Sequence, residues 1–199
     1  LAEQLRRPGQ QLEHTIQTNG TLLDDAWGEL LARHGFLVGL SIDGPPELHD
    51  VYRVDKRGAP TAAKVLRGLE VLRRHGVEVN VLCTVNAANE QHGRTVYRFF
   101  RDELGAKWVQ FIPIIERVAE AAEDGTVPWT SWRDRPLYVQ EGEVVTGRSV
   151  TGDQYGRFLI DVFEEWVRRD VGEVYVQMFD VALANWVGEP PGLCVHSET

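Results

Sequence analysis

Short apolar runs alternate with longer amphipathic stretches through most of the chain, and this alternation limits the possible folds most strongly. The short runs are rich in β-branched residues, as in VEVNVLCTV at 77–85, and the longer ones carry apolar residues at helical spacing. We expect strands at 12–17, 36–42, 77–85, 107–115 and 174–177, and helices at 22–34, 61–74, 92–104, 151–169 and 181–187. Strands that alternate with helices favour a parallel sheet, so the chain is predicted to be α/β.

Residues that commonly mark helix boundaries support these helices. Gly35 directly follows the first of them and Gly76 lies two residues past the end of the second, where glycine readily takes the left-handed conformation that ends a helix. Thr61 is placed to cap the second helix, and Thr151 with Gln154 three residues later resembles a capping box. The boundary signals therefore agree with the apolar spacing.

Composition narrows the class of protein and its partners. The 199 residues are 43% hydrophobic and 26% charged, which favours one folded domain over disorder. A net charge of -9 opposes binding to nucleic acid, because the phosphate backbone would repel it. No apolar run reaches the roughly 20 residues that span a bilayer, and no signal peptide opens the sequence. With two cysteines and no disulfide framework, we expect a soluble cytoplasmic protein with no nucleic-acid or membrane partner.

Two observations predict that the chain is a segment of a longer protein. Its single methionine is Met178, so the first residue is not a translation start. Four strand–helix units amount to half of an eightfold barrel or two thirds of a sixfold one, which leaves a parallel edge strand uncovered. We therefore expect further strands before Leu1.

Polar and small residues follow four of the predicted strands, at 18–21, 41–44, 84–86 and 114–116. In parallel α/β folds, the loops at the carboxyl ends of strands bind ligands, so this pattern indicates a binding site. The same residue types also form turns and cap helices, and both interpretations stay open at this point.

The sequence also carries a series of short motifs. In order, they are QTNGT at 17–21, LSIDGP at 40–45 followed by His49 and Arg53, VQFIP at 109–113, WTSWRDRPLY at 129–138, QMFD at 177–180 and Cys194. Each is weak alone, but the ordered set resembles the radical S-adenosylmethionine (SAM) family. Within that family it is similar to the anaerobic sulfatase-maturating enzymes, which carry a cysteine-rich C-terminal SPASM extension.

The resemblance implies a fold and a division of the chain. The α/β units would be the later strands of a partial, TIM-like (β/α)6 radical SAM barrel that leads into the SPASM extension. Residues 1–117 are then the second half of the barrel and 118–150 a loop or insertion. Residues 151–190 are a helical connection, and 191–199 begin the auxiliary-cluster domain.

The resemblance also implies cofactor-binding residues. Ser41 matches a serine that hydrogen-bonds SAM, and Arg53 an arginine whose planar fork can pair bidentately with the methionyl carboxylate. Ile115 matches an apolar residue that lies against the adenosyl group, and Asn19 is a further candidate for that pocket. Cys194 matches the first cysteine ligand of an auxiliary [4Fe–4S] cluster.

Each assigned residue also has an ordinary interpretation. Arg53 can be a surface arginine beside Lys56 and Arg57, Ile115 can be barrel core, and a single cysteine such as Cys194 is more often no ligand. Other candidates are given only ordinary roles: Cys83 as a small buried hydrophobe, Asp43 as a turn former and Asp180 as a helix cap. The six histidines show no metal-ligand spacing.

The chain departs from the family pattern in three ways. It lacks the Cys-x3-Cys-x2-Cys motif that holds the SAM-binding [4Fe–4S] cluster, and the Gly-Gly-Glu stretch that binds the SAM amino group. The aspartate proposed as catalytic base would lie beyond Thr199. We therefore expect no catalytic residue in this segment, and the segment alone should be inactive.

The function implied by the resemblance is that of an oxidoreductase acting on a sulfatase polypeptide. A serine or cysteine in a Cys/Ser-x-Pro/Ala-x-Arg motif would become Cα-formylglycine, with SAM and [4Fe–4S] clusters as cofactors and ferredoxin or flavodoxin as electron donor. The nearest alternative is another SPASM enzyme that forms thioether or carbon–carbon crosslinks in peptides. A non-catalytic α/β binding domain is a further alternative, and a metal-dependent barrel hydrolase comes last. The stretch 116–150 is a candidate cover for the barrel mouth or a surface insertion.

Overall fold

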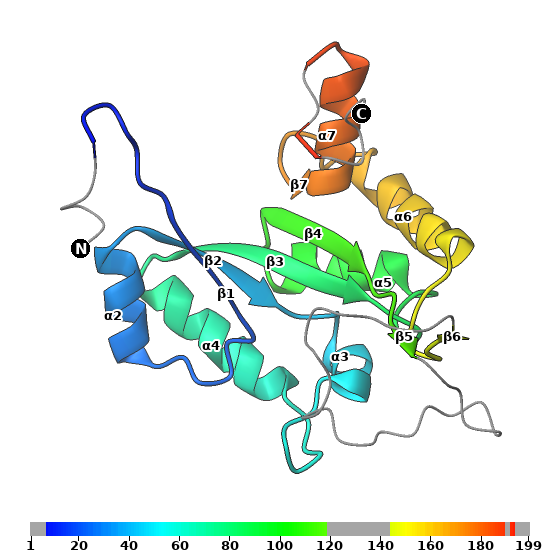
Figure 1. Ribbon diagram of the computed structural model, residues 1–199, viewed down its shortest axis with the longest axis horizontal. Coiled ribbons are helices and arrows are strands. Elements are labelled where there is room, and N and C mark those ends of the chain that lie inside the picture. Colours follow the sequence, from blue (N-terminus) through cyan, green and yellow to red (C-terminus); the bar gives the residue numbers. More distant parts are fainter. Residues whose placement is uncertain (1–6, 119–143, 190–191, 194–199) are drawn as a thin grey trace.

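A five-stranded parallel sheet forms the centre of the computed structural model, which describes residues 7–118, 144–189 and 192–193 (Figure 1). Its order is β1-β2-β3-β4-β7, with bounds of His14–Thr18, Phe36–Ser41, Glu78–Val85, Trp108–Pro113 and Tyr175–Val176. All four pairings within this sheet are parallel. The predicted α/β class and all five predicted strands are therefore confirmed, with strand ends that differ by at most two residues.

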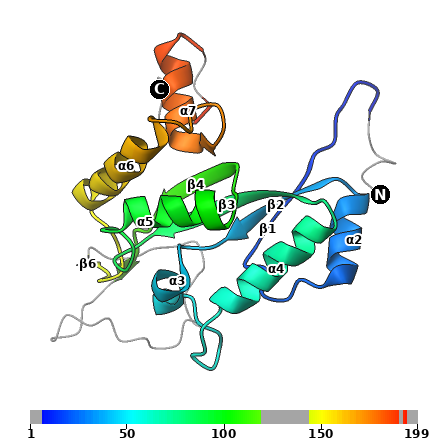
Figure 2. The same cartoon turned by 180° about the vertical axis from the view of Figure 1, so that it is seen from behind.

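Helices cover one face of the sheet, as Figure 2 shows from the side on which α4 and α5 lie in front of the strands. The helices predicted from the sequence are α2 at Asp25–Arg33, α4 at Ala62–Arg74, α5 at Gly93–Arg98, α6 at Gly152–Trp166 and α7 at Gln177–Trp186. Helix α5 continues as a π-helical turn at Phe99–Glu103. Among the described residues, no helix is long and apolar enough to cross a membrane.

The two faces of the sheet differ in polarity. Leu40 on β2, Val81 and Cys83 on β3 and Phe111 on β4 are buried in the main hydrophobic core. Because side chains alternate along a strand, the residues between them lie on the opposite face, which we call the open face. In sheet order it includes Gln17, Gly39, Ser41, Asn80, Leu82, Thr84, Gln110 and Ile112. The open face thus combines polar and apolar groups, whereas the face under the helices is apolar.

Local signals set several helix boundaries as the sequence predicts. Thr151 and Gln154 form the predicted capping box at the start of α6, with bonds between each side chain and the other residue's backbone N–H. Gly35 and Gly76 follow α2 and α4 with φ angles of 61° and 68°, in the left-handed region that favours glycine. Both predictions are confirmed.

The start of α4 is capped differently from the prediction. Thr61 occupies the N-cap position, but its hydroxyl donates to the backbone carbonyl oxygen of Arg53, at 2.5 Å, and makes no capping bond. Oδ1 of Asp50 instead accepts from the backbone N–H groups of Thr61 and Ala62, both at 2.8 Å. The helix N-terminus is thus satisfied by a side chain eleven residues away, which makes the predicted Thr61 cap wrong.

Helix α3, Pro46–Tyr52, was not predicted from the sequence. It begins directly after the turn that follows β2, with proline at its first position, where the missing N–H costs nothing and the fixed φ suits a helix. A proline at the first helical position is a helix-start signal. Helix α3 carries His49, and Arg53 is its C-cap residue.

A small hairpin closes the base of the segment that was predicted to be a loop or insertion. Strand β5, Arg117–Val118, pairs antiparallel with β6, Val144–Val145. Next to this hairpin, the backbone N–H of Glu116 donates to the Ser149 hydroxyl at 2.9 Å, and the Arg148 guanidinium contacts the Glu116 carboxylate. Residues 119–143, which include the motif at 129–138, lie outside the described residues, so the role of this segment stays a prediction.

The close approach of α4 to the end of β1 predicts that a substitution of the glycine at this contact is destabilising, and a glycine within α6 provides the control. A Cβ at Gly68 would lie 2.2 Å from the carbonyl oxygen of Gly20, so Gly68→Ala should lower the free energy of unfolding by about 1–3 kcal/mol. A Cβ at Gly156, inside α6, would meet no heavy atom within 4 Å, so Gly156→Ala is the matched control and should raise that energy by about 0.5–1 kcal/mol. Melting temperatures of the two variants should move in opposite directions, and a stable Gly68→Ala variant would contradict this packing.

Candidate functional site

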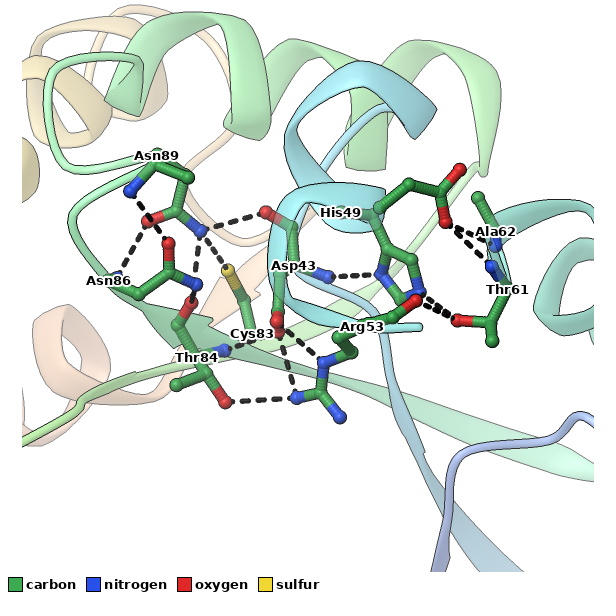
Figure 3. A network of polar contacts seen from close by, with 11 residues as sticks. Asp43, His49, Arg53, Thr61, Ala62, Cys83, Thr84, Asn86 and Asn89 are labelled. Carbon is green, nitrogen blue, oxygen red and sulfur yellow. Dashed lines mark hydrogen bonds and ion pairs between the residues drawn. The ribbon is translucent and has the colours of Figure 1, made fainter. Parts of the chain in front are cut away.

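Asp43 lies at the carboxyl end of β2 with only 2% of its surface exposed (Figure 3). Its carboxylate accepts from Nε and Nη2 of Arg53, at 2.5 and 2.9 Å, and from the backbone N–H of Thr84, at 2.8 Å. Its own backbone N–H donates to Nδ1 of His49 at 3.1 Å, and its carbonyl oxygen accepts from Nδ2 of Asn89 at 2.9 Å. Asp43 therefore joins β2, β3 and α3, a role that goes beyond the predicted turn.

Arg53 reaches this carboxylate from the end of α3. Its Nη2 also donates to the Thr84 hydroxyl at 3.0 Å, so the guanidinium spans the ends of β2 and β3. About a quarter of its side chain, 28%, is exposed. Among the described residues no hydrogen bond is formed by Nη1, which leaves one end of the guanidinium for another group. The interpretation of Arg53 as an ordinary surface arginine is wrong, because its side chain forms a partly buried ion pair with Asp43.

A second branch of the network runs through His49, which is 1% exposed. Nδ1 of His49 accepts from the N–H of Asp43, so the ring proton of the neutral form is on Nε2, which lies 3.2 Å from the Thr61 hydroxyl. The Thr61 hydroxyl in turn donates to the carbonyl oxygen of Arg53. Burial lowers the pKa of His49, with the Arg53 charge acting in the same direction and the Asp43 carboxylate against it.

The loop after β3 completes the network from the other side. Asn89 is fully buried, and its Nδ2 donates to the carbonyl oxygens of Asp43 and Thr84, both at 2.9 Å. Its Oδ1 accepts from the backbone N–H of Asn86 at 2.8 Å. The loop is therefore tied to both strand ends, which limits the movement of the Arg53 partners.

The structure brings the predicted SAM-binding residues to one edge of the sheet. Ser41 is the last residue of β2, on the open face opposite Leu82, and is 6% exposed. Ile115 lies two residues past β4 with 52% of its surface exposed. Asn19 follows β1, and its Oδ1 accepts from the backbone N–H and hydroxyl of Thr21, as in a local turn. Arg53 joins this edge through α3.

The other residues singled out in the sequence have separate surroundings. Cys83 is buried in the core, and burial raises the pKa of its thiol, which confirms the prediction of a small buried hydrophobe. Asp180 lies in the first turn of α7, whose N-cap is Val176, so the predicted helix cap is wrong. Burial raises the pKa of the Asp180 carboxyl group. Cys194 lies outside the described residues.

The chemistry available at this edge is the binding of an anionic, partly apolar ligand. The guanidinium of Arg53 offers N–H donors, Ser41 offers a hydroxyl and Ile115 an exposed apolar side chain. Within the part of the chain that the structure describes, no group of three or more His, Cys, Asp or Glu side chains could hold a metal ion. The described site thus offers hydrogen-bond donors and an apolar side chain at one edge of the sheet.

Comparison with known proteins identifies the family. Residues 1–100 match the family model described as the radical SAM superfamily, and these residues include β1, β2, β3 and the whole Asp43 network. This chain belongs to the radical SAM superfamily. Members of this family bind SAM and a [4Fe–4S] cluster, and the hydrogen-bonding and apolar groups at the carboxyl edge of the sheet agree with the first of these ligands.

Relatives within the superfamily are similar along most of this radical SAM chain. The serine-type anaerobic sulfatase-maturating enzyme of Bacteroides thetaiotaomicron is 42% identical over 192 residues, which are 96% of this chain and 44% of that protein. The cysteine-type enzyme of Clostridium perfringens (strain 13 / Type A) is 33% identical over 156 residues, 78% of this chain and 36% of that protein. The chain therefore spans less than half the length of these curated relatives.

A solved structure shows the same fold. Native anSMEcpe with bound AdoMet and the Cp18Cys peptide superimposes with a TM-score of 0.74 and 30% identity, over 92% of this chain and 45% of that chain. The five parallel strands match the partial radical SAM barrel of that protein. The sequence resemblance to sulfatase-maturating enzymes is therefore confirmed.

Sequence reasoning missed the network that surrounds Arg53. Asn89 was not singled out, and Asp43 and His49 were given no role at the site. A signal was present in their spacing, because His49 and Arg53 are four residues apart and so lie one helical turn apart if a helix follows β2. The contact with Asn89 spans 46 residues, and no local pattern predicts it.

The lowered pKa of His49 predicts how stability depends on pH. The unfolded chain takes up a proton as the pH falls through about 6.5, while the buried ring takes it up only at lower pH. The stabilisation that comes from the neutral, buried ring of His49 is therefore fully present above about pH 6.5, and the free energy of unfolding falls as the pH drops below it. The melting temperature should therefore fall further between about pH 7.5 and about pH 5.5 in the wild type than in His49→Asn. These two pH values lie about one unit above and below the ordinary pKa of histidine. The side-chain oxygen of the asparagine can still accept the hydrogen bond from the backbone N–H of Asp43.

The exposed His34 provides the control for this prediction. His34→Asn should retain the wild-type dependence on pH, because this ring is not enclosed by the network. If His49→Asn and the wild type lose the same stability over the acidic range, the neutral form of His49 is not part of what holds the fold.

Proposed function

We propose that this chain is the SAM-binding part of an enzyme that converts a serine or cysteine of a sulfatase to Cα-formylglycine. The observation that carries the proposal is the similarity to sulfatase-maturating enzymes along 96% of the chain. Both serine-type and cysteine-type enzymes are among these relatives, so either residue can be the target. The sulfatase polypeptide, with a Cys/Ser-x-Pro/Ala-x-Arg motif, is the proposed partner, and the peptide bound to anSMEcpe supports this choice.

Ser41, Arg53 and Ile115 bind SAM in this proposal. Nη1 of Arg53 donates to the methionyl carboxylate, the Ser41 hydroxyl forms a hydrogen bond, and Ile115 lies against the adenosyl group. The support is their shared position at the carboxyl edge, together with the partial exposure of Arg53 and Ile115. SAM, when bound, would supply 5′-deoxyadenosyl radical chemistry for hydrogen abstraction from the substrate Cβ. The residues of this chain hold the ligand in a fixed orientation, which is their contribution to the rate.

The finer architecture belongs to the same proposal. The sheet represents the later strands of a (β/α)6 barrel, with 1–117 as its second half, 118–150 as an insertion and 151–190 as a helical connection. Residues 191–199 begin the SPASM extension, where Cys194 is the first ligand of an auxiliary [4Fe–4S] cluster. Relatives more than twice as long as this chain support the presence of further parts, including the cluster motif upstream. Ferredoxin or flavodoxin is the proposed electron donor.

The decisive experiment uses the full-length protein, purified without oxygen and with its clusters reconstituted. It is incubated with SAM, dithionite and a peptide that carries the sulfatase motif, and the peptide mass is recorded. A serine peptide should lose two hydrogen atoms, and in a cysteine peptide the thiol should be replaced by an aldehyde. Peptides with alanine at the target position are the control and should keep their mass.

Two other results would separate the alternatives. Cleavage of SAM without change in the sulfatase peptide would remove the proposed substrate and leave a different peptide-modifying radical SAM enzyme, such as one that forms crosslinks. A full-length protein that carries no cluster and does not cleave SAM would contradict the enzyme assignment and favour a non-catalytic binding domain.

A further inference from the structure

The contacts of Arg53 limit how it can bind an anion. A guanidinium carries five N–H groups: one on Nε and two on each terminal nitrogen. Nε donates to Asp43, and Nη2 donates to both Asp43 and Thr84, so three of the five are engaged within the protein. The side of the fork that could hold a carboxylate bidentately through Nε and Nη2 is already occupied by Asp43. Only the Nη1 end is left among the described contacts.

We propose that Asp43 is a positioning residue, which acts through Arg53 by fixing the guanidinium so that its Nη1 end meets the carboxylate of SAM. This inference rests on the proposed SAM-binding role of Arg53 and adds the residue that orients it. It also replaces the bidentate contact expected from the sequence with a contact through one nitrogen. Thr84 assists, because its hydroxyl accepts from Nη2 and its backbone N–H donates to Asp43.

The surroundings of Asp43 make it suitable for this role. The carboxylate is almost fully buried, and both of its oxygens accept hydrogen bonds from fixed donors on β3 and at the end of α3. Its main chain is held on one side by His49 and on the other by Asn89. The carboxylate therefore cannot rotate without breaking several bonds, and a guanidinium paired with it is fixed in position and direction.

Because Asp43 is negatively charged, the direction in which its substitution changes the affinity for SAM tests the proposal. A negative group beside Arg53 opposes the binding of another carboxylate, because it offsets the positive charge that attracts the ligand. If charge alone mattered, Asp43→Asn would strengthen the binding of SAM. If Asp43 positions Arg53, the same substitution weakens binding even though it removes a repulsive charge.

The experiment measures SAM binding by isothermal titration calorimetry, under anoxic conditions, with the full-length protein and reconstituted clusters. The variants are Asp43→Asn, Arg53→Ala and the double variant. Asp43→Asn should weaken SAM binding on the order of tenfold, as expected for disturbing hydrogen bonds to a charged group. In the Arg53→Ala background the same substitution should change the affinity less than about twofold, because the residue through which it acts is gone.

A second ligand separates positioning from a general effect on the fold. 5′-Methylthioadenosine keeps the adenosyl part of SAM and lacks the amino acid part, so its affinity should be the same in Asp43→Asn and the wild type. Asp55→Asn is the matched protein control, because Asp55 is a more exposed carboxylate, in the loop after α3, that pairs with Lys64 at 2.8 Å. It should leave the affinities for both ligands unchanged.

Each outcome decides between the proposals. Unchanged or tighter SAM binding in Asp43→Asn would overturn the positioning role. The role would also be overturned if Asp43→Asn weakened SAM binding as much in the Arg53→Ala background as in the wild type. Weaker binding of 5′-methylthioadenosine by Asp43→Asn would overturn it as well. If Arg53→Ala itself leaves SAM binding intact, the proposed role of Arg53 fails and this inference fails with it.

If Asp43→Asn does not fold, the variant Thr84→Val tests the positioning of Arg53 instead, since it keeps the ion pair and removes one acceptor of Arg53. It should weaken the binding of SAM about threefold, and unchanged binding would overturn the proposal.

Discussion

The bidentate ion pair between Asp43 and Arg53 is the interaction on which the site depends. Burial of a carboxylate costs several kcal/mol, and this cost is offset only when an opposite charge and hydrogen-bond donors surround it. Here Arg53 supplies the charge and two N–H groups, and the backbone of Thr84 supplies a third. Because loss of one partner of such a pair typically costs about 3–5 kcal/mol, β2, β3 and α3 are held in one arrangement.

The position of this pair follows from the parallel sheet. In a parallel sheet all carboxyl ends meet at one edge, so residues distant in sequence, such as Asp43 and Thr84, become neighbours there. The apolar side chains on one face pack under the helices, and the polar groups are left on the open face and at this edge. The same chain therefore produces a rigid core on one side and a surface with hydrogen-bonding capacity on the other.

Much of the fold could be predicted because its signals are local. Alternating apolar runs located all five strands of the sheet, and Thr151 with Gln154 marked the start of α6. Where a tertiary contact replaces a local one, prediction failed: the hydroxyl of Thr61 bonds to Arg53, and Asp50 caps α4 instead. A side chain can satisfy a helix end from any part of the chain, and apolar spacing carries no information about such a choice.

The sequence by itself determined the α/β class, the order of strands and helices, and the family resemblance, because these follow from short-range periodicity and contiguous motifs. It also indicated Ser41 and Arg53 as ligand-binding residues. Only the tertiary structure decided how Arg53 is used, since its partners Asp43 and Thr84 lie 10 and 31 residues away along the chain. The physical reason is that a buried charge takes whichever donors the fold brings within hydrogen-bond distance, and these are settled only when the strands pair.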